Sequence, residues 1–242
     1  MRQLTIVIPI LNEAKNIVHL IPEIHKVQLK LNLRKFEILL IDDNSSDDIQ
    51  LVFNKLKKKF KYLKLHVRKK DRDLSKSCIF GFEKSTNKNI LVMDGDLQHN
   101  PKYIKNLFNK YISGNFDIVI GSRDLFKRKN KGLSFIRKLF SIVLIVVINF
   151  LLGAKTADPM TGFFIFNKKI YTQNKKNLYA SGYKILSDLI YSSKKKLKIG
   201  DISIIFKKRN TGESKMSLFI LLKLINFILT RWLKKYFFFK NS

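Results

Sequence analysis

The sequence is poor in cysteine and proline. Its 242 residues include a single cysteine, Cys78, and four prolines. One cysteine excludes an intrachain disulfide framework and a multi-cysteine metal site, and it is typical of a protein from a reducing compartment. A low proline content together with 45% hydrophobic residues excludes a disordered tail protein. We therefore expect one large domain, or one domain with an appendage.

Acidic residues are also scarce. The chain holds 18 Asp and Glu against 48 Lys and Arg, a formal net charge of +30. Such a surface suits nucleic acid, anionic lipid or a phosphorylated substrate, although a lysine-rich composition also follows from an AT-rich genome. A nucleic-acid-binding protein would interleave aromatic and basic residues on one face. The lysine tracts at 57–59 and 194–196 instead lie at scattered helix ends, so we expect no nucleic-acid partner.

No apolar run reaches the roughly 20 residues that a membrane-spanning helix needs. The first run, Leu4–Pro9, is too short for the hydrophobic region of a signal peptide and no small-residue cleavage site follows it, so secretion is not expected. The longest stretch, Leu139–Leu152, has 14 residues with only Ser141 and Asn149 polar. It predicts a buried helix, an interfacial helix or a partial membrane insertion.

A second apolar stretch, Leu218–Leu233, carries one narrow polar stripe at helical spacing. Aromatic and lysine residues follow it from Trp232 to Phe239. An amphipathic, basic and aromatic-rich segment is typical of a helix that lies in the membrane interface. The alternative is that this stretch and Leu139–Leu152 pack together as a second core.

Five short apolar runs alternate with helix-like segments through the first half of the chain. The runs are Leu4–Pro9, Phe36–Ile41, Leu63–Val67, Ile90–Met93 and Phe116–Ile120. The helical patterns run from Asn12 to Leu33 with a bend at Pro22, from a cap at Asp47 or Asp48, over Leu74–Phe82 and from Pro101. This alternation predicts an α/β fold with a mostly parallel sheet covered on both faces. A late strand is expected over Leu197–Phe206.

Acidic residues cluster where three of these runs end, at Glu13, at Asp42 and Asp43, and at Asp94 and Asp96. Ligands bind at the carboxyl ends of strands in such sheets. Asp94 and Asp96 lie two residues apart, so we expect them to point the same way and to face solvent. With Gln98 they form an oxygen-only set that suits Mg²⁺ or Mn²⁺, and Gly95 would let a ligand approach the backbone. The alternative is a plain Asp-rich turn.

The remaining candidates each have two interpretations. Asp43 either recognises a nucleobase or ribose or belongs to a turn with a helix cap, and Glu13 also suits the first turn of a helix. His99, beside the acidic cluster, is either a functional or a structural residue. Arg123, Arg209 and Lys215 are either phosphate clamps or solvated charges. The chain has no Gly-x-Gly-x-x-Gly after its first strand, no Walker-type loop and no His/Cys zinc spacing.

Taken together, these segments resemble family 2 glycosyltransferases with a GT-A fold, in the polyprenyl-phosphate glycosyltransferase (dolichol-phosphate mannose synthase) branch. Six matching segments appear in family order across residues 4–215: IVIPILNEAKNI, LLIDDNSSDD, LVMDGDLQHNP, DIVIGSR, DPMTGF and FKKRNTGESK. Two departures stand out. Leu11 occupies a position where the family usually has Tyr, and the segment from Arg72 to Ser77 lacks the Gly-Leu-Gly often seen before the third helix.

The resemblance implies a role for each matching residue. Nucleotide-binding residues would be Pro9, Leu11, Glu13, Ile41 and Asp43. Asp94, Asp96 and Gln98 would hold the metal and the diphosphate, with Gly95 between them. Donor or acceptor phosphates would meet Arg123, Arg209 and Lys215, and the lipid phosphate would meet Arg137 and Ser141.

The implied organisation is a GT-A domain over 1–215, with an acceptor-side helix over 137–152, and an amphipathic membrane-associating tail over 216–242. The implied activity is inverting transfer of a hexose, mannose from GDP-mannose, onto a polyprenyl monophosphate at the cytoplasmic face of a membrane, with Mg²⁺ or Mn²⁺. The alternative within the enzyme class is transfer from a UDP-sugar to undecaprenyl phosphate. Since the acceptor phosphate is already an oxyanion, a strong general base is not required. A membrane-protein partner is left open.

Overall fold

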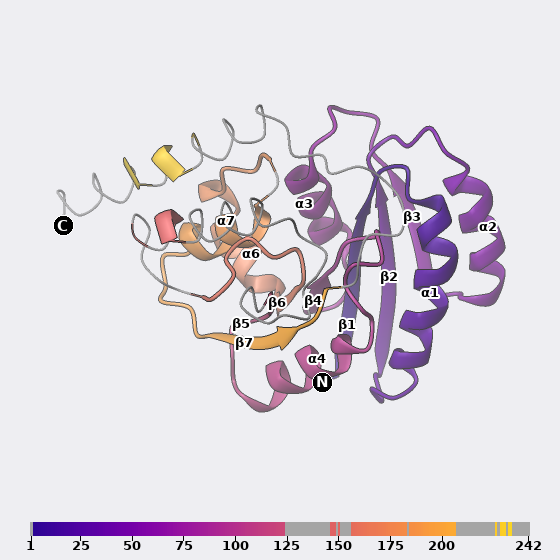
Figure 1. Ribbon diagram of the computed structural model, residues 1–242, viewed down its shortest axis with the longest axis horizontal. Coiled ribbons are helices and arrows are strands. Elements are labelled where there is room, and N and C mark those ends of the chain that lie inside the picture. Colours follow the sequence, from indigo (N-terminus) through magenta and orange to yellow (C-terminus); the bar gives the residue numbers. More distant parts are fainter. Residues whose placement is uncertain are drawn as a thin grey trace.

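The computed structural model describes residues 2–123, 146–148, 150, 156–182, 184–206, 226, 228–230 and 232–233. Seven strands form one sheet in the order β3-β2-β1-β4-β6-β5-β7 (Figure 1). Every neighbouring pair is parallel except those made by β6, which runs antiparallel to β4 and β5. The strands are β1 (Gln3–Ile10), β2 (Lys35–Asp42), β3 (Leu63–Val67), β4 (Asn89–Val92), β5 (Ile118–Arg123), β6 (Phe164–Asn167) and β7 (Ile199–Ile204).

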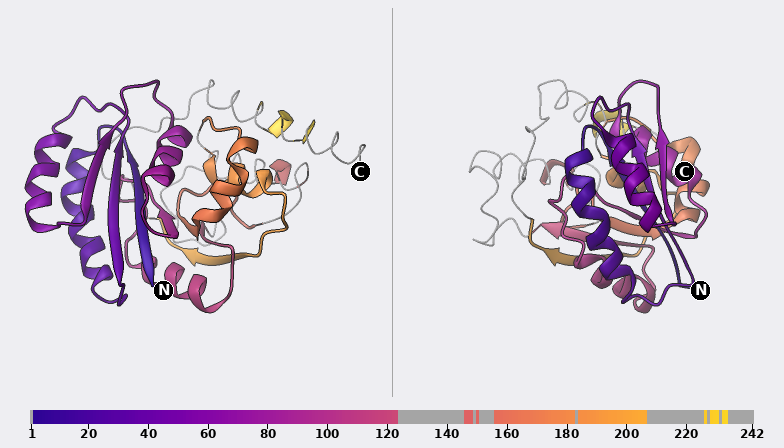
Figure 2. Two further views of the ribbon diagram at one scale, coloured as in Figure 1. Left: turned by 180° about the vertical axis from the view of Figure 1, so that it is seen from behind. Right: turned by 90° about the vertical axis from the view of Figure 1, so that its right-hand side faces the viewer.

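Helices cover both faces of the sheet, as the two views of Figure 2 show. One face packs against α1 (Ala14–Gln28), α2 (Ile49–Lys59) and α4 (Tyr103–Ser113). The other packs against α3 (Leu74–Lys84), α6 (Lys168–Asn174) and α7 (Ile185–Ser192), with a short 3₁₀ turn η1 (Lys175–Asn177) after α6. The predicted α/β architecture with a mostly parallel sheet is confirmed.

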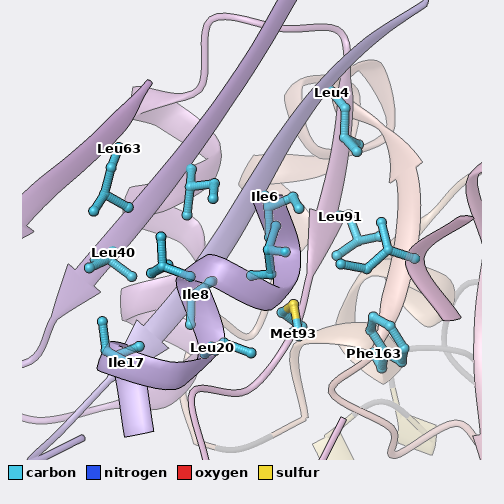
Figure 3. Close-up of a cluster of buried hydrophobic side chains, with 14 of the residues drawn as sticks. Leu4, Ile6, Ile8, Ile17, Leu20, Leu40, Leu63, Leu91, Met93 and Phe163 are labelled. Carbon is cyan, nitrogen blue, oxygen red and sulfur yellow. The ribbon is translucent and has the colours of Figure 1, made fainter. Parts of the chain in front are cut away.

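Side-chain alternation along β1 divides the core into two clusters. Leu4, Ile6 and Ile8 point into the cluster beneath α1, where Figure 3 shows them with Leu20 of that helix. Val7 points to the opposite cluster, beneath α3. Because successive side chains of a strand face opposite sides, a strand buried on both faces reads as a continuous apolar run. That is the pattern the sequence has.

The expected elements differ from the observed ones in two places. Helix α1 ends at Gln28 and contains Pro22. Pro22 removes the donor for the Val18 carbonyl, but Val18 lies on the exposed face, where water can take its place. Strand β6 was not expected, because it has only four residues and runs against its neighbours. It brings the segment before Phe164 to the edge where β4 and β5 end.

Short helical pieces of the two apolar stretches lie beside each other. Ile148 and Ile228 are buried in a small cluster with Met160, Tyr179 and Tyr191. The apolar residues around them remain exposed: Val146 at 59%, Phe150 at 84%, Leu229 at 48%, Trp232 at 39% and Leu233 at 45%. The described pieces thus share one small contact and present apolar faces outward. Across the described ranges, no helix has both the length and the hydropathy to cross a bilayer.

Glu37 is a buried carboxylate that ties three parts of the sheet together. It accepts hydrogen bonds from the Thr5 hydroxyl of β1 at 2.8 Å and from the Lys64 ammonium of β3 at 2.7 Å. Before β4, Thr86 adds its amide at 2.7 Å and its hydroxyl at 2.8 Å. Burial raises the pKa of Glu37, but these hydrogen bonds outweigh it, so the pKa lies below its ordinary value.

We expect Glu37→Gln to lower the free energy of unfolding at pH 7 by about 1–3 kcal/mol, because charge-assisted hydrogen bonds are lost at a buried site. A lowered pKa in the folded state gives stability that is present above the unfolded pKa and lost as the pH falls through the folded value. The difference in the free energy of unfolding between the wild type and the variant should therefore become smaller at acidic pH. Urea unfolding across that pH range measures it.

The matched control is Glu23→Gln, since Glu23 is 54% exposed and pairs only with Lys26 among the described ion pairs. An exposed pair of this kind contributes about 0.5 kcal/mol or less. An equal effect of the two substitutions at pH 7 would contradict the role given to Glu37.

Candidate active site

The strand order of the sheet reverses direction between β1 and β4. The chain adds β2 and β3 on one side of β1 and β4 on the other, which is where ligands bind in open α/β sheets. The Val7 carbonyl accepts the Met93 amide at 3.2 Å, so the backbone groups of Val7 face β4. Along a strand, the backbone groups that face the same neighbouring strand recur at every second residue. Residue 9 is the next to face β4, and as proline it has no N–H to donate. Pro9 therefore ends the β1–β4 ladder at this edge.

The loops after β1 and β2 are joined across the top of these strands. The Asn12 amide donates to the Ser45 hydroxyl at 2.8 Å, and the Ser46 amide donates to the Asn12 side-chain oxygen at 2.8 Å. Asp47 accepts the Ala14 amide at 2.7 Å, so it satisfies a free donor at the start of α1. The expected cap on α2 is not formed: Asp48 occupies that position without a side-chain cap bond.

The predicted nucleotide-binding residues after β1 and β2 differ in how accessible they are. Leu11 and Glu13 are partly exposed, and Glu13 accepts the Asn16 side-chain amide at 2.6 Å. Ile41 is fully buried in the core beneath α3. Its side chain therefore cannot meet a nucleotide in this structure, and any contact would come from its backbone.

Asp43 is buried and both of its carboxylate oxygens have partners within the protein. One pairs with Arg68, itself 7% exposed, and the other accepts the Asp73 amide at 2.6 Å. Burial raises the pKa of Asp43, while the Asp73 amide and the Arg68 charge act against that rise. The residue thus holds the segment between β3 and α3, a role that neither interpretation of the sequence included. Its expected contact with the base or ribose stays a prediction.

Asp73 extends this network, although the sequence analysis did not find it. Its carboxylate caps α3 by accepting the Lys76 amide at 3.0 Å. It also accepts the Gly182 amide at 2.7 Å and the Ser181 hydroxyl at 3.0 Å. The Asp-x-x-Lys spacing ahead of α3 was a possible cap signal, but the contact with residues more than a hundred positions away left no trace in the sequence.

The acidic motif lies on a turn after β4. The strand ends at Val92, and Leu97 adopts a positive φ of 64°. Neither Asp94 nor Asp96 lies in the strand, so strand alternation does not determine their directions, and the expectation that they point the same way stays a prediction. Asp94 is 36% exposed. Asp96 is only 4% exposed and accepts the Gln98 amide at 3.1 Å, so it does not face solvent as expected.

Two glycines shape this turn. A Cβ on Gly95 would lie 2.9 Å from Ile10 on the core side, so packing accounts for the glycine, and the expected approach of a ligand stays a prediction. A Cβ on Gly162, in the DPMTGF segment, would lie 2.8 Å and 3.0 Å from the two Asp94 carboxylate oxygens. The space beside the Asp94 carboxylate therefore depends on Gly162, which the sequence analysis did not single out.

The donor set fits a divalent metal that is completed by substrate. In the part of the chain that the structure describes, no group of three or more His, Cys, Asp and Glu side chains could hold a metal ion alone. Asp94, Asp96 and Gln98 offer oxygen atoms only. Mg²⁺ and similar cations commonly take one or two carboxylates and complete their shell with water and substrate phosphates. The residues present are consistent with that arrangement.

The remaining predicted residues are basic or lie near the acceptor. Arg123 ends β5, opposite Ile204 of β7, so its backbone is at the carboxyl edge. The other four, Arg137, Ser141, Arg209 and Lys215, lie outside the described residues.

A family model for glycosyl transferase family 2 matches residues 5–174. The chain belongs to glycosyltransferase family 2. It is similar to a dolichol-phosphate mannosyltransferase from Pyrococcus furiosus, with 32% identity over 88% of this chain and 59% of the relative. Relatives of the same name from Mycosarcoma maydis and Saccharomyces cerevisiae are 27% and 26% identical over 88% of this chain, covering 73% and 80% of their lengths. The chain thus spans less than two thirds of the Pyrococcus protein.

Solved structures of other glycosyl-transferring enzymes share the fold. Glucosyl-3-phosphoglycerate synthase from Mycobacterium tuberculosis, crystallised with Mn²⁺, UDP-glucose and phosphoglyceric acid, superposes with a TM-score of 0.72. The match covers 96% of this chain and 80% of that protein at 16% identity. A complex of the same enzyme with UDP gives a TM-score of 0.71. The expected GT-A arrangement of sheet and helices is confirmed.

We expect Asp94→Asn and Asp96→Asn to weaken Mn²⁺ binding by at least about tenfold, since even outer-shell substitutions at metal sites cost 10–100-fold. Asn at position 96 keeps a side-chain oxygen for the Gln98 amide, so the turn is preserved and only the charge is lost. Electron paramagnetic resonance of free Mn²⁺, with and without GDP, measures the affinity.

Asp48→Asn is the matched control, because Asp48 is exposed and makes no side-chain cap bond. Its Mn²⁺ affinity should equal that of the wild type. Unchanged affinity in both site variants would remove the metal assignment.

Proposed function

We propose that this protein transfers a hexose, mannose from GDP-mannose, onto a polyprenyl monophosphate of the dolichyl type. The observation that carries the proposal is the similarity to three dolichol-phosphate mannosyltransferases over 88% of the chain. The alternative, a UDP-sugar donor with undecaprenyl phosphate, has less support. The solved complexes with UDP-glucose are 16% identical to this chain, which bears on the fold and not on the donor.

The chemistry proposed is a single displacement at the anomeric carbon. A phosphate oxygen of the acceptor forms the new bond to C1 as the bond from C1 to the donor diphosphate breaks, and GDP leaves with that electron pair. The configuration at C1 inverts. Because the acceptor oxygen is already anionic at neutral pH, no side chain has to remove a proton, which agrees with the lack of an obvious base in the motifs.

The candidate residues, described or not, would have distinct tasks in this scheme. Asp94 and Asp96, with Gln98, would hold a divalent cation, Mg²⁺ or Mn²⁺, which when bound offsets the charge of the departing diphosphate. The Asp43–Arg68 pair fixes the segment beside the expected base site. Arg123, Arg209 and Lys215 would bind donor or acceptor phosphates, and Arg137 and Ser141 would meet the lipid phosphate.

The proposed place of action is the cytoplasmic face of a membrane, and the apolar segments support action at a membrane surface. A polyprenyl phosphate does not leave the bilayer readily, so the enzyme has to reach it at the surface. The exposed Phe150, Leu229, Trp232 and Leu233 surround one small buried contact, and such faces suit the interfacial layer. The net charge of +30 adds attraction to anionic lipid, about 1 kcal/mol for each Lys or Arg near the surface.

Product analysis tests the reaction. We expect GDP-mannose and dolichyl phosphate to give dolichyl phosphate mannose in the organic phase, detected by mass spectrometry, with little product from UDP-glucose or UDP-galactose. The mixture should contain Mn²⁺ or Mg²⁺ and lipid vesicles. Preferential product from UDP-glucose and undecaprenyl phosphate would replace the main proposal with its alternative.

Membrane attachment is tested by the triple variant Phe150→Ser, Leu229→Ser and Leu233→Ser. Burial of one such side chain is worth about 1.5–3 kcal/mol, so partitioning onto anionic vesicles should fall at least about tenfold. Sedimentation at low salt measures it. Activity toward long-chain acceptors should fall more than activity toward short, water-soluble ones.

The control carries Leu29→Ser and Leu51→Ser, which are exposed at 66% and 60% on the other half of the molecule. It removes apolar surface without touching the two segments and should sediment like the wild type. Equal loss in both variants would show that the 146–150 and 226–233 pieces are not the attachment surface.

A further inference from the structure

His99 is enclosed at the end of the acidic turn. Its ring is 1% exposed, stacks on Phe163 with centroids 5.0 Å apart at 15°, and meets Phe206 edge-on at 5.0 Å. Phe163 directly precedes β6, and Phe206 follows β7 by two residues. Two rings from separate parts of the sheet therefore fix the plane of the imidazole.

The Nδ1 atom of His99 accepts the backbone amide of Asp94 at 3.0 Å. A nitrogen that accepts a hydrogen bond carries no proton, so the neutral ring holds its proton on Nε2. The Asp94 carboxylate lies 3.7 Å from the same nitrogen, and Nδ1 has no proton to give it. The hydrogen bond thus holds the backbone of Asp94. The Nδ1 atom does not neutralise the negative charge of the Asp94 carboxylate.

Gly162 lies against the Asp94 carboxylate. A side chain there would press on both carboxylate oxygens, with a Cβ at 2.8 Å and 3.0 Å. Gly162 is joined to Phe163, so the segment that leaves room for the carboxylate also supplies the ring that stacks on His99. Asp94 is thereby held at its amide by His99 and accommodated at its carboxylate by the glycine.

The turn needs such support. Leu97 has a positive φ of 64°, a backbone conformation that residues other than Gly, Asn and Asp rarely adopt. The residues from Asp94 to His99 are outside the regular ladder of β4. Without a tie at its last residue, this turn would have several alternative conformations, and a metal site tolerates little displacement of its ligands.

We propose that His99 is a positioning residue, which fixes Asp94 for the metal and diphosphate through the Nδ1 acceptor, with Gly162 and Phe163 as the wall behind it. The inference rests on the proposed metal-dependent transfer. It names a role for the imidazole that needs neither proton transfer nor direct contact with the metal.

Three substitutions separate the acceptor from the ring. In His99→Asn the side-chain oxygen can take the place of Nδ1, in His99→Gln the oxygen is displaced by one carbon, and in His99→Phe the stacking remains without an acceptor. We expect Asn to bind Mn²⁺ within about threefold of the wild type, and Gln and Phe to bind about tenfold more weakly, because a buried amide loses its partner. The signal of free Mn²⁺ in the presence of GDP or UDP reports the affinity without any turnover.

A second variant tests the wall without altering the imidazole. Gly162→Ala should weaken Mn²⁺ binding by about tenfold while thermal unfolding changes little, because the new methyl group displaces only the carboxylate. His25→Phe is the stability control. His25 lies near the end of α1, at the opposite edge of the sheet, and its ring forms a 2.7 Å hydrogen bond with the Tyr62 hydroxyl. The Mn²⁺ affinity of this variant should therefore equal that of the wild type.

The outcomes distinguish the two proposals. Wild-type affinity in His99→Phe and Gly162→Ala would overturn the positioning role even if the protein transfers mannose. Equal losses in the Asn, Gln and Phe variants would also overturn it, because the Nδ1 acceptor would then not be the deciding feature. The expected ranking of Mn²⁺ affinities without any hexose transfer would support the positioning role and reject the proposed function.

Discussion

The site depends on the separation of two parallel strands. β1 and β4 share a ladder until Val7, and Pro9, the next residue of β1 to face β4, has no N–H to continue it. Beyond that point β1 pairs only with β2, through Ile10 and Asp42. The loop after β1 and the acidic turn after β4 follow where this pairing stops. A proline inside a central strand would normally disrupt it; here it sets where the ladder ends.

The loops at the carboxyl edge of the sheet are held by buried polar contacts. Asp43 and Arg68 pair beneath the surface, and Asp73 links them to Ser181 and Gly182. Buried ion pairs contribute little net stability, yet removing one partner alone is strongly destabilising, because the other charge is left uncompensated. The arrangement therefore restricts the loops to one conformation. This suits an enzyme whose catalysis is mostly electrostatic, since preorganised charges do not have to move during the reaction.

Much of this fold follows from the sequence, because its determinants are local. The apolar runs and helical spacings predicted six of the seven strands and the helices α1 to α4, since a buried parallel strand has a continuous apolar pattern. β6 could not be found in this way. Its four residues form a strand only because β4 and β5 are already in place on both sides.

The site was predictable in composition but not in geometry. Asp94, Asp96 and Gln98 stand out by residue type and spacing, whereas the burial of Asp96 and the turn at Leu97 depend on tertiary packing. Gly162 lies against the Asp94 carboxylate, and His99 accepts the Asp94 amide while its ring stacks on Phe163. Neither effect has a periodicity or a motif of its own. Residues that contact a metal-binding side chain, and not the metal itself, can be recognised only from the tertiary structure.

The central claim is that the acidic turn after β4 holds a metal together with the diphosphate of a nucleotide. Anomalous diffraction at the manganese edge, from crystals grown with Mn²⁺ and GDP, tests it most directly. We expect one strong peak at the Asp94 and Asp96 carboxylates, next to the GDP diphosphate. A nucleotide bound at the carboxyl edge of the sheet with no manganese at these carboxylates, or manganese bound elsewhere on the chain, would contradict it.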